Sequence, residues 1–78
     1  MIIYIIGGDY MIIVIDDVLK QKGKTRYWLT QQIGITYPNM KRLCDNDTSS
    51  IRFSVIESIC IALECEPNDI FKIERVSK

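Results

Sequence analysis

The sequence predicts a mainly α-helical single domain in which five short helices are framed by short N- and C-terminal β-strands. Three observations predict this fold class. Apolar residues recur at helical spacing through the middle of the chain, glycines stand where two of the helices should end, and apolar or alternating runs lie towards both ends. The chain has 78 residues, of which 47% are hydrophobic and 26% charged, and this is ordinary composition for one globular domain.

The first predicted elements are a strand and a helix. Met11–Ile15 is an unbroken apolar run rich in β-branched residues, which predicts a short strand. Asp16–Lys22 follows as a short helix with Val18 and Leu19 facing inward. Gly23 is predicted to end this helix, because glycine tolerates the left-handed backbone found at helix C-termini.

Two helices joined by a tight turn come next and form the most informative part of the chain. Thr25 is the predicted N-cap of the helix Arg26–Ile33, and Gly34 is placed to end that helix. A further helix follows at Tyr37–Cys44. The apolar side chains expected inside are Leu29, Ile33, Met40 and Leu43. Two short helices meeting at a glycine corner are typical of a helix-turn-helix, here spanning residues 25–44.

The last third of the chain predicts a loop, two helices and a strand. Asp45–Ser50 is a polar loop. Ser54–Leu63 opens with the Ser-x-x-Glu spacing of a capping box and predicts a helix whose inward residues are Ile56, Ile59, Cys60 and Leu63. Pro67 suits the first turn of a short fifth helix, and the alternation of apolar and charged residues in Phe71–Val76 predicts the second strand.

The stretch TRYWLTQQIGITYPNMKRL resembles the lambda-repressor-like (Cro/repressor, XRE-type) helix-turn-helix family. The residues that match the family positions are Leu29, Gly34, Ile35, Thr36, Met40 and Leu43. The later stretch FSVIESICIALECEPNDIF is similar to the fourth and fifth helices of its small single-domain subgroup, so the resemblance covers about residues 11–76. It implies a five-helix fold, sequence-specific binding of double-stranded DNA, and a role as a prokaryotic or phage transcriptional regulator.

The resemblance also implies a set of DNA-binding residues, with the helix Tyr37–Cys44 reading the major groove. Tyr37, Pro38 and Arg42 match base-facing positions, and Asn39 and Lys41 are expected to contact bases or the backbone. Thr36 matches the cap of the recognition helix, while Thr25 and Arg26 match phosphate contacts. Arg42 has the fork geometry for guanine; the alternative for Arg42 is an ion pair with Asp45 or Asp47.

Two residues depart from the family pattern. Thr30 stands where the family usually has alanine, and its hydroxyl is expected to bond a backbone carbonyl one turn back. Pro38 is the second residue of the aligned recognition helix and disfavours helical geometry at Tyr37. An alternative is therefore that Tyr37 is the cap and the helix starts at Pro38.

The neutral net charge conceals a dipolar chain. Between Val18 and Cys44 there is no acidic residue, and the six basic residues are Lys20, Lys22, Lys24, Arg26, Lys41 and Arg42. The other segments hold four basic and ten acidic residues. The positive charge thus falls on the predicted helix-turn-helix, where it would attract the phosphate backbone of DNA. The alternative is that these lysines are ordinary solvent-exposed residues of short helices with no binding role.

The residues and motifs that the sequence lacks argue against an enzyme or a metal-binding protein. The chain has no histidine, no paired catalytic carboxylates and no glycine-rich phosphate loop, so we expect no enzyme, cofactor or metal site. Cys60 and Cys65 are expected to fill the core, and Cys44 to be more exposed, where a redox switch is conceivable. Trp28 is expected to pack half-exposed against the first helix, with DNA contact as the alternative.

These features predict a cytoplasmic protein that is nucleoid-associated when bound to double-stranded DNA, with no membrane segment. A homodimer is expected, because one helix contacts few bases, and the edge of Met11–Ile15 needs covering. The alternative is a protein-interaction module on a helix-turn-helix scaffold, such as an antitoxin or a phage-encoded inhibitor.

The first ten residues predict a translated leader, or an extra strand, before a domain at 11–78. Gly7–Met11 can be encoded by GGA GGT GAT TAT ATG, in which a bacterial ribosome-binding sequence directly precedes a start codon. We therefore hypothesise a native start at Met11. The alternative is a β-hairpin that pairs Ile2–Ile6 with Met11–Ile15.

Overall fold

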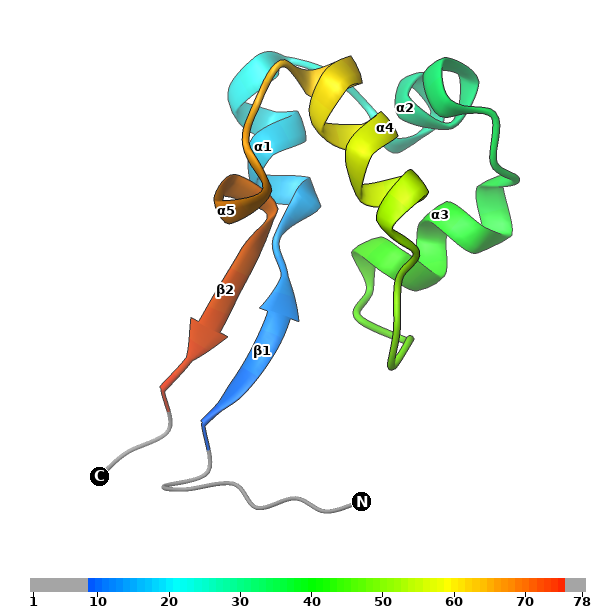
Figure 1. The fold of residues 1–78 in the computed structure, drawn as a ribbon. Coiled ribbons are helices and arrows are strands. Elements are labelled where there is room, and N and C mark those ends of the chain that lie inside the picture. Colours follow the sequence, from blue (N-terminus) through cyan, green and yellow to red (C-terminus); the bar gives the residue numbers. More distant parts are fainter. Residues whose placement is uncertain (1–8, 76–78) are drawn as a thin grey trace.

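A computed structural model describes residues 9–75 and has the predicted order of one strand, five helices and one strand (Figure 1). The elements are β1 (Tyr10–Ile13), α1 (Ile15–Lys22), α2 (Arg26–Ile33), α3 (Tyr37–Cys44), α4 (Phe53–Leu63), α5 (Pro67–Ile70) and β2 (Phe71–Glu74). The predicted fold class is confirmed. The segment Ile2–Ile6 of the hairpin alternative lies outside the described residues.

The N-terminal strand is shifted relative to its prediction. It ends at Ile13 instead of Ile15, because the backbone leaves the extended region at Val14 (φ −116°, ψ 40°), whose N–H donates to the carbonyl of Ile70 at 2.8 Å. Ile15 then begins α1 and is fully buried. The strand also includes Tyr10, which the leader hypothesis places before the native start, and that hypothesis remains a prediction.

The predicted capping box at the start of α4 is wrong. Arg52 is the N-cap, and Phe53 begins the helix without a side-chain cap. The carbonyl of Arg52 accepts the N–H groups of Val55 and Ile56, both at 3.0 Å, so Ser54 already lies inside the first turn and its side chain cannot cap it. A capping box does open α5, whose first residue is Pro67. The side chain of the N-cap Glu66 accepts the backbone N–H of Asp69, and the side chain of Asp69 accepts the backbone N–H of Glu66.

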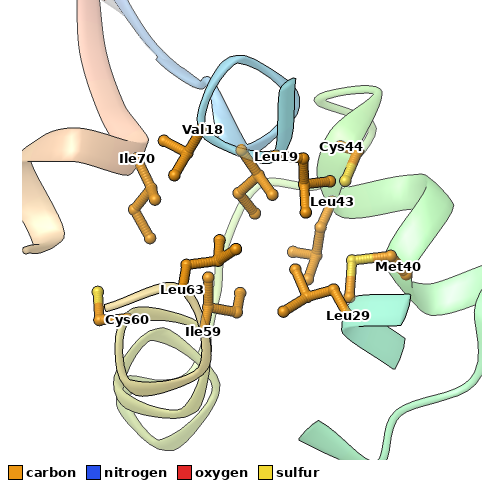
Figure 2. Close-up of a cluster of buried hydrophobic side chains, with 11 residues drawn as sticks. Val18, Leu19, Leu29, Met40, Leu43, Cys44, Ile59, Cys60, Leu63 and Ile70 are labelled. Atoms are coloured by element: carbon orange, nitrogen blue, oxygen red, sulfur yellow. The ribbon is translucent and has the colours of Figure 1, made fainter. Parts of the chain in front are cut away.

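The core is formed where the helices converge (Figure 2). α2 packs against both α3 and α4, and α1 packs against α4 and α5. The five largest fully buried side chains are Ile15, Leu29, Met40, Ile59 and Ile70. Each stabilises the fold by roughly 1.5–3 kcal/mol relative to an exposed side chain, so one residue from each of the five helices holds this small domain together.

The two strands form a separate antiparallel pair beside the helices. Met11 lies opposite Ile73, and Ile13 opposite Phe71. Directly opposed residues share a face, so one face of the sheet carries only apolar side chains. The other face carries Tyr10, Ile12, Lys72 and Glu74.

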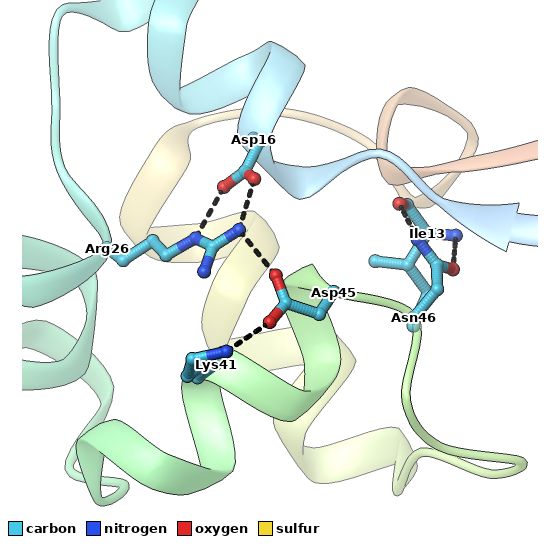
Figure 3. A network of polar contacts seen from close by, with 6 residues as sticks. All are labelled: Ile13, Asp16, Arg26, Lys41, Asp45 and Asn46. Carbon is cyan, nitrogen blue, oxygen red and sulfur yellow. Dashed lines mark hydrogen bonds and ion pairs between the residues drawn. The ribbon is translucent and has the colours of Figure 1, made fainter.

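Asn46 ties this sheet to the end of α3 (Figure 3). Its side-chain oxygen accepts the backbone N–H of Ile13 at 2.6 Å, and its side-chain nitrogen donates to the carbonyl of Ile13 at 3.0 Å. Asn46 has a left-handed backbone (φ 61°), which asparagine tolerates better than most residues. The amide thus occupies the edge of β1 in the way that a neighbouring strand would.

Candidate nucleic-acid interface

The turn between α2 and α3 is built from local signals that the sequence displays. Thr25 accepts the N–H of Trp28 at 3.0 Å and caps α2. Gly34 ends α2 in the left-handed region (φ 75°), with its N–H bonded to the carbonyl of Thr30 at 2.8 Å. A Cβ at Gly34 would meet nothing within 4 Å, so the backbone angle and not space explains the glycine. Thr36 then caps α3 by accepting the N–H of Asn39 at 3.3 Å.

Thr30 and Pro38, the two residues that depart from the family pattern, both fit the local backbone. The Thr30 hydroxyl donates to the carbonyl of Tyr27 at 2.5 Å, as predicted, and the residue is buried. The alternative in which Tyr37 caps the recognition helix is wrong, because Thr36 is the cap and Tyr37 is the first helical residue. Pro38 lies in the first turn, where its missing N–H would have no partner within the helix.

One face of α3 is turned towards solvent along most of its length. Its buried residues are Met40, Leu43 and Cys44, which anchor the helix to the core. Its exposed residues are the five that the resemblance assigns to DNA: Tyr37, Pro38, Asn39, Lys41 and Arg42. The buried face of α3 therefore fixes the helix to the core, and its opposite, largely polar face is free to contact a partner.

Arg42 and Asn39 border a groove of about 360 Å³ between α3 and the start of α4. The other side of the groove is formed by the loop that follows α3 and includes Thr48, Ser50 and Arg52. Hydroxyl groups and an exposed arginine are suited to phosphate oxygens. The sequence prediction did not include these residues, although the basic residue Arg52, two positions after the hydroxyl-rich run Thr48–Ser50, was a usable signal.

Arg26 is engaged by two carboxylates (Figure 3). Its Nε and Nη2 donate to the two oxygens of Asp16 at 2.9 and 2.5 Å, and Nη2 also donates to Asp45 at 2.9 Å. The second Asp45 oxygen accepts Lys41 Nζ at 2.7 Å. The network joins α1, α2 and α3, so a phosphate contact by Arg26, which stays a prediction, would have to compete with these bonds.

This network determines which basic side chains of the helix-turn-helix are paired with acids. Asp45 pairs with Arg26 and Lys41, and Arg42 makes no ion pair within residues 9–75, so the predicted alternative of an Arg42–Asp45 or Arg42–Asp47 pair is not observed. Bonding to Arg26 lowers the pKa of Asp16, and Lys41 is the main cause of the lowered pKa of Asp45. Two of the six basic charges are thus partly neutralised: Arg26 by acids 10 and 19 positions away, and Lys41 by Asp45 one helical turn along, while Arg42 remains available.

The Asp16–Arg26 pair predicts a measurable pH dependence. Because the folded-state pKa of Asp16 lies below 3.8, its stabilising effect is complete above that pH and is lost as pH falls through the lowered value. Asp16→Asn should reduce the free energy of unfolding by about 0.5–1 kcal/mol at neutral pH, a small value because the side chain is half-exposed. Urea denaturation across the acid range measures it, with the exposed neighbour Asp17→Asn as control. A loss that is the same at acidic and neutral pH would contradict the prediction.

Trp28 is half-buried, as expected, and packs against the core, with Lys24 Nζ lying 4.8 Å from the centre of its ring; its predicted contact with the first helix stays a prediction. The expectation of a more exposed Cys44 is wrong. Cys44 is 7% exposed, and burial raises the pKa of its thiol to about 12, which removes the basis for a redox switch there. Cys60 is buried and Cys65 is half-buried against the core.

Residues 9–75 contain neither a candidate metal-binding cluster nor a candidate membrane-spanning helix. No group of three or more histidine, cysteine or acidic side chains is arranged to hold a metal ion in this range. None of the helices there combines the length and the apolar character needed to cross a bilayer.

Comparison with known proteins agrees with this geometry. Residues 14–75 match the family described as the Cro/C1-type HTH DNA-binding domain. A curated relative, the uncharacterized HTH-type transcriptional regulator YozG of Bacillus subtilis (strain 168), is 39% identical over 62 residues, which are 80% of this chain and 74% of the relative. A crystal structure of a candidate DNA-binding protein from Bacteroides fragilis superposes with a TM-score of 0.72 and 25% identity, covering 81% of this chain and 100% of that chain.

Proposed function

Since this chain belongs to the Cro/C1-type helix-turn-helix DNA-binding family and binds double-stranded DNA sequence-specifically to regulate transcription, we propose that α3 is the helix that enters the major groove. The observation that carries the proposal is the division of α3 into two faces. Met40, Leu43 and Cys44 are buried, while every α3 residue assigned to DNA is exposed. The protein acts through binding and not through catalysis.

The residues of this surface divide into those that read bases and those that hold the backbone. Arg42 and Asn39 lie along the groove beside α3 and have the donor groups that recognise guanine and adenine edges. Tyr37 and Pro38 offer apolar contact to a thymine methyl group. Backbone contacts come from Thr25, Thr36 and Lys41, and from Thr48, Ser50 and Arg52 across the groove. Arg26 chiefly positions α2 against α1 and α3 through its carboxylate bonds.

The working form in this proposal is a homodimer acting in the cytoplasm, where its DNA lies. One α3 of eight residues contacts few base pairs, so a single copy has limited specificity. Two copies related by a two-fold axis would read half-sites about 34 Å apart on one face of the duplex. The alternative of a protein-interaction module is disfavoured, because the exposed face of α3 retains its polar and basic side chains.

The first experiment measures fluorescence anisotropy of the full chain on random duplex DNA at two salt concentrations. We expect affinity to fall by about 100-fold between roughly 50 and 200 mM salt, because bound phosphates release counterions. Absence of binding at the lower concentration would overturn the DNA proposal and favour the protein-partner alternative. Binding that ignores salt would contradict the assigned phosphate contacts.

A further inference from the structure

The two edges of the small sheet are not equivalent. β1 lies between β2 and the loop that follows α3 (Figure 1). The edge of β1 is occupied at Ile13, where Asn46 takes both the backbone N–H and the carbonyl. Asn46 therefore covers part of the edge that the Met11–Ile15 strand was expected to offer to a second copy, and β2 has the more accessible edge.

The hydrogen-bond pattern defines which groups of β2 face outward. In an antiparallel pair, residues alternate between those that bond across the pair and those whose N–H and carbonyl point away from it. Because Ile13 bonds to Asn46, the Ile13–Phe71 position is of the outward kind. Two residues along, Met11–Ile73 is of the same kind, so the N–H and carbonyl of Ile73 point out from β2. Within residues 9–75 they have no hydrogen-bond partner.

The charged side chains at this edge are complementary to those of a second, antiparallel copy of the same edge. Lys72 and Glu74 flank Ile73 and lie on the polar face of the sheet, opposite Ile12 and Tyr10. If two β2 strands pair antiparallel about a two-fold axis through Ile73, each Lys72 faces the Glu74 of the other strand. The two Ile73 residues meanwhile exchange both of their backbone hydrogen bonds, which leaves Lys72 and Glu74 at the closer, non-hydrogen-bonded positions.

We propose that a second copy of this chain binds at the outer edge of β2 in this register and forms a four-stranded sheet across the two-fold axis. This inference rests on the proposed function, because it supplies the interface of the proposed homodimer. The side chain at the centre of the edge supports it: Ile73 is 38% exposed, and pairing sets the two Ile73 side chains beside each other on the apolar face, where each covers part of the other. Two ion pairs, Lys72 with Glu74 in each direction, select the register.

The test uses charge reversal with the full chain and no DNA. Sedimentation equilibrium should find a dimer for the natural sequence. Lys72→Glu alone sets acidic groups against each other, and Glu74→Lys alone sets basic groups against each other, so each should weaken dimerisation by about tenfold or more. An equal mixture of the two variants should recover a dimer, because every opposed pair is then of opposite charge. Lys20→Glu, an exposed residue of α1, is the matched control and should leave the dimer unchanged.

Each outcome decides the proposal. A monomeric natural chain, a dimer that ignores both single changes, or a mixture that fails to recover dimer would overturn it. Circular dichroism confirms that the single variants are folded, which we expect because neither residue opposes a charge on β1. Random-duplex anisotropy separates the two proposals: salt-dependent binding by a monomeric chain would overturn only the interface, and a β2-paired dimer that does not bind DNA would overturn only the DNA function.

Discussion

Arg42→Ala is expected to weaken binding to the chain's DNA site by about 10- to 100-fold, which corresponds to roughly 1–3 kcal/mol for one bidentate contact to guanine. The structure supports this residue over the other basic residues of the helix-turn-helix. Arg26 and Lys41 are bonded to carboxylates, whereas Arg42 is exposed on the groove side of α3 and makes no ion pair within residues 9–75. The effect should be largest for the preferred sequence and smaller for random DNA, because a base contact carries discrimination.

The measurement needs a duplex selected by the natural chain, followed by anisotropy titrations with that duplex and a scrambled one. Arg42→Lys separates charge from geometry, since lysine keeps the charge but lacks the planar fork. Lys20→Ala is the control, because Lys20 is an exposed basic residue of α1 that is assigned neither to DNA nor to the edge of β2. Equal losses from Arg42→Ala on both duplexes would assign Arg42 to the phosphate backbone instead.

Ile59→Ala is expected to destabilise the fold by about 2–5 kcal/mol through lost burial and the cavity left behind. Ile59 is fully buried at the centre of α4, the helix that packs against both α1 and α2. At about 0.05–0.15 kcal/mol per residue, a domain of this size has only roughly 4–12 kcal/mol of stability, so this single change removes a large part of it. DNA binding should fall together with the folded fraction.

Urea denaturation monitored by circular dichroism measures this effect. Ile61→Ala makes the same chemical change two residues further along the same helix, where the side chain is 71% exposed, and should change the free energy of unfolding by no more than about 0.5 kcal/mol. Similar losses from the two variants would show that helix propensity, and not burial, governs α4. A loss for Ile61→Ala alone would place an unrecognised interface on its exposed side.

The features of the fold that depend on neighbours in the chain were predictable. Thr25, Gly34 and Thr36 cap or end helices through bonds to residues within four positions, so their roles follow from residue type and spacing. The start of α4 was not predictable in this way. Ser54 had the spacing of a cap, but the path of the chain from the preceding loop gave that position to Arg52.

The candidate site also has features that depend on neighbours in the chain and features that depend on distant residues. The amino-acid sequence by itself determined the helix-turn-helix, its outward residues and the concentration of basic residues around it, because the periodicity of α3 alone separates Met40 and Leu43 from Asn39 and Arg42. Only the tertiary structure decided which charges are available. Asp16 and Asp45 meet Arg26 across three helices, and Asn46 reaches Ile13 from 33 positions away. Local periodicity orients a side chain relative to its own helix, whereas pairing between distant residues depends on how the helices pack, and that is decided by the shape of the whole core.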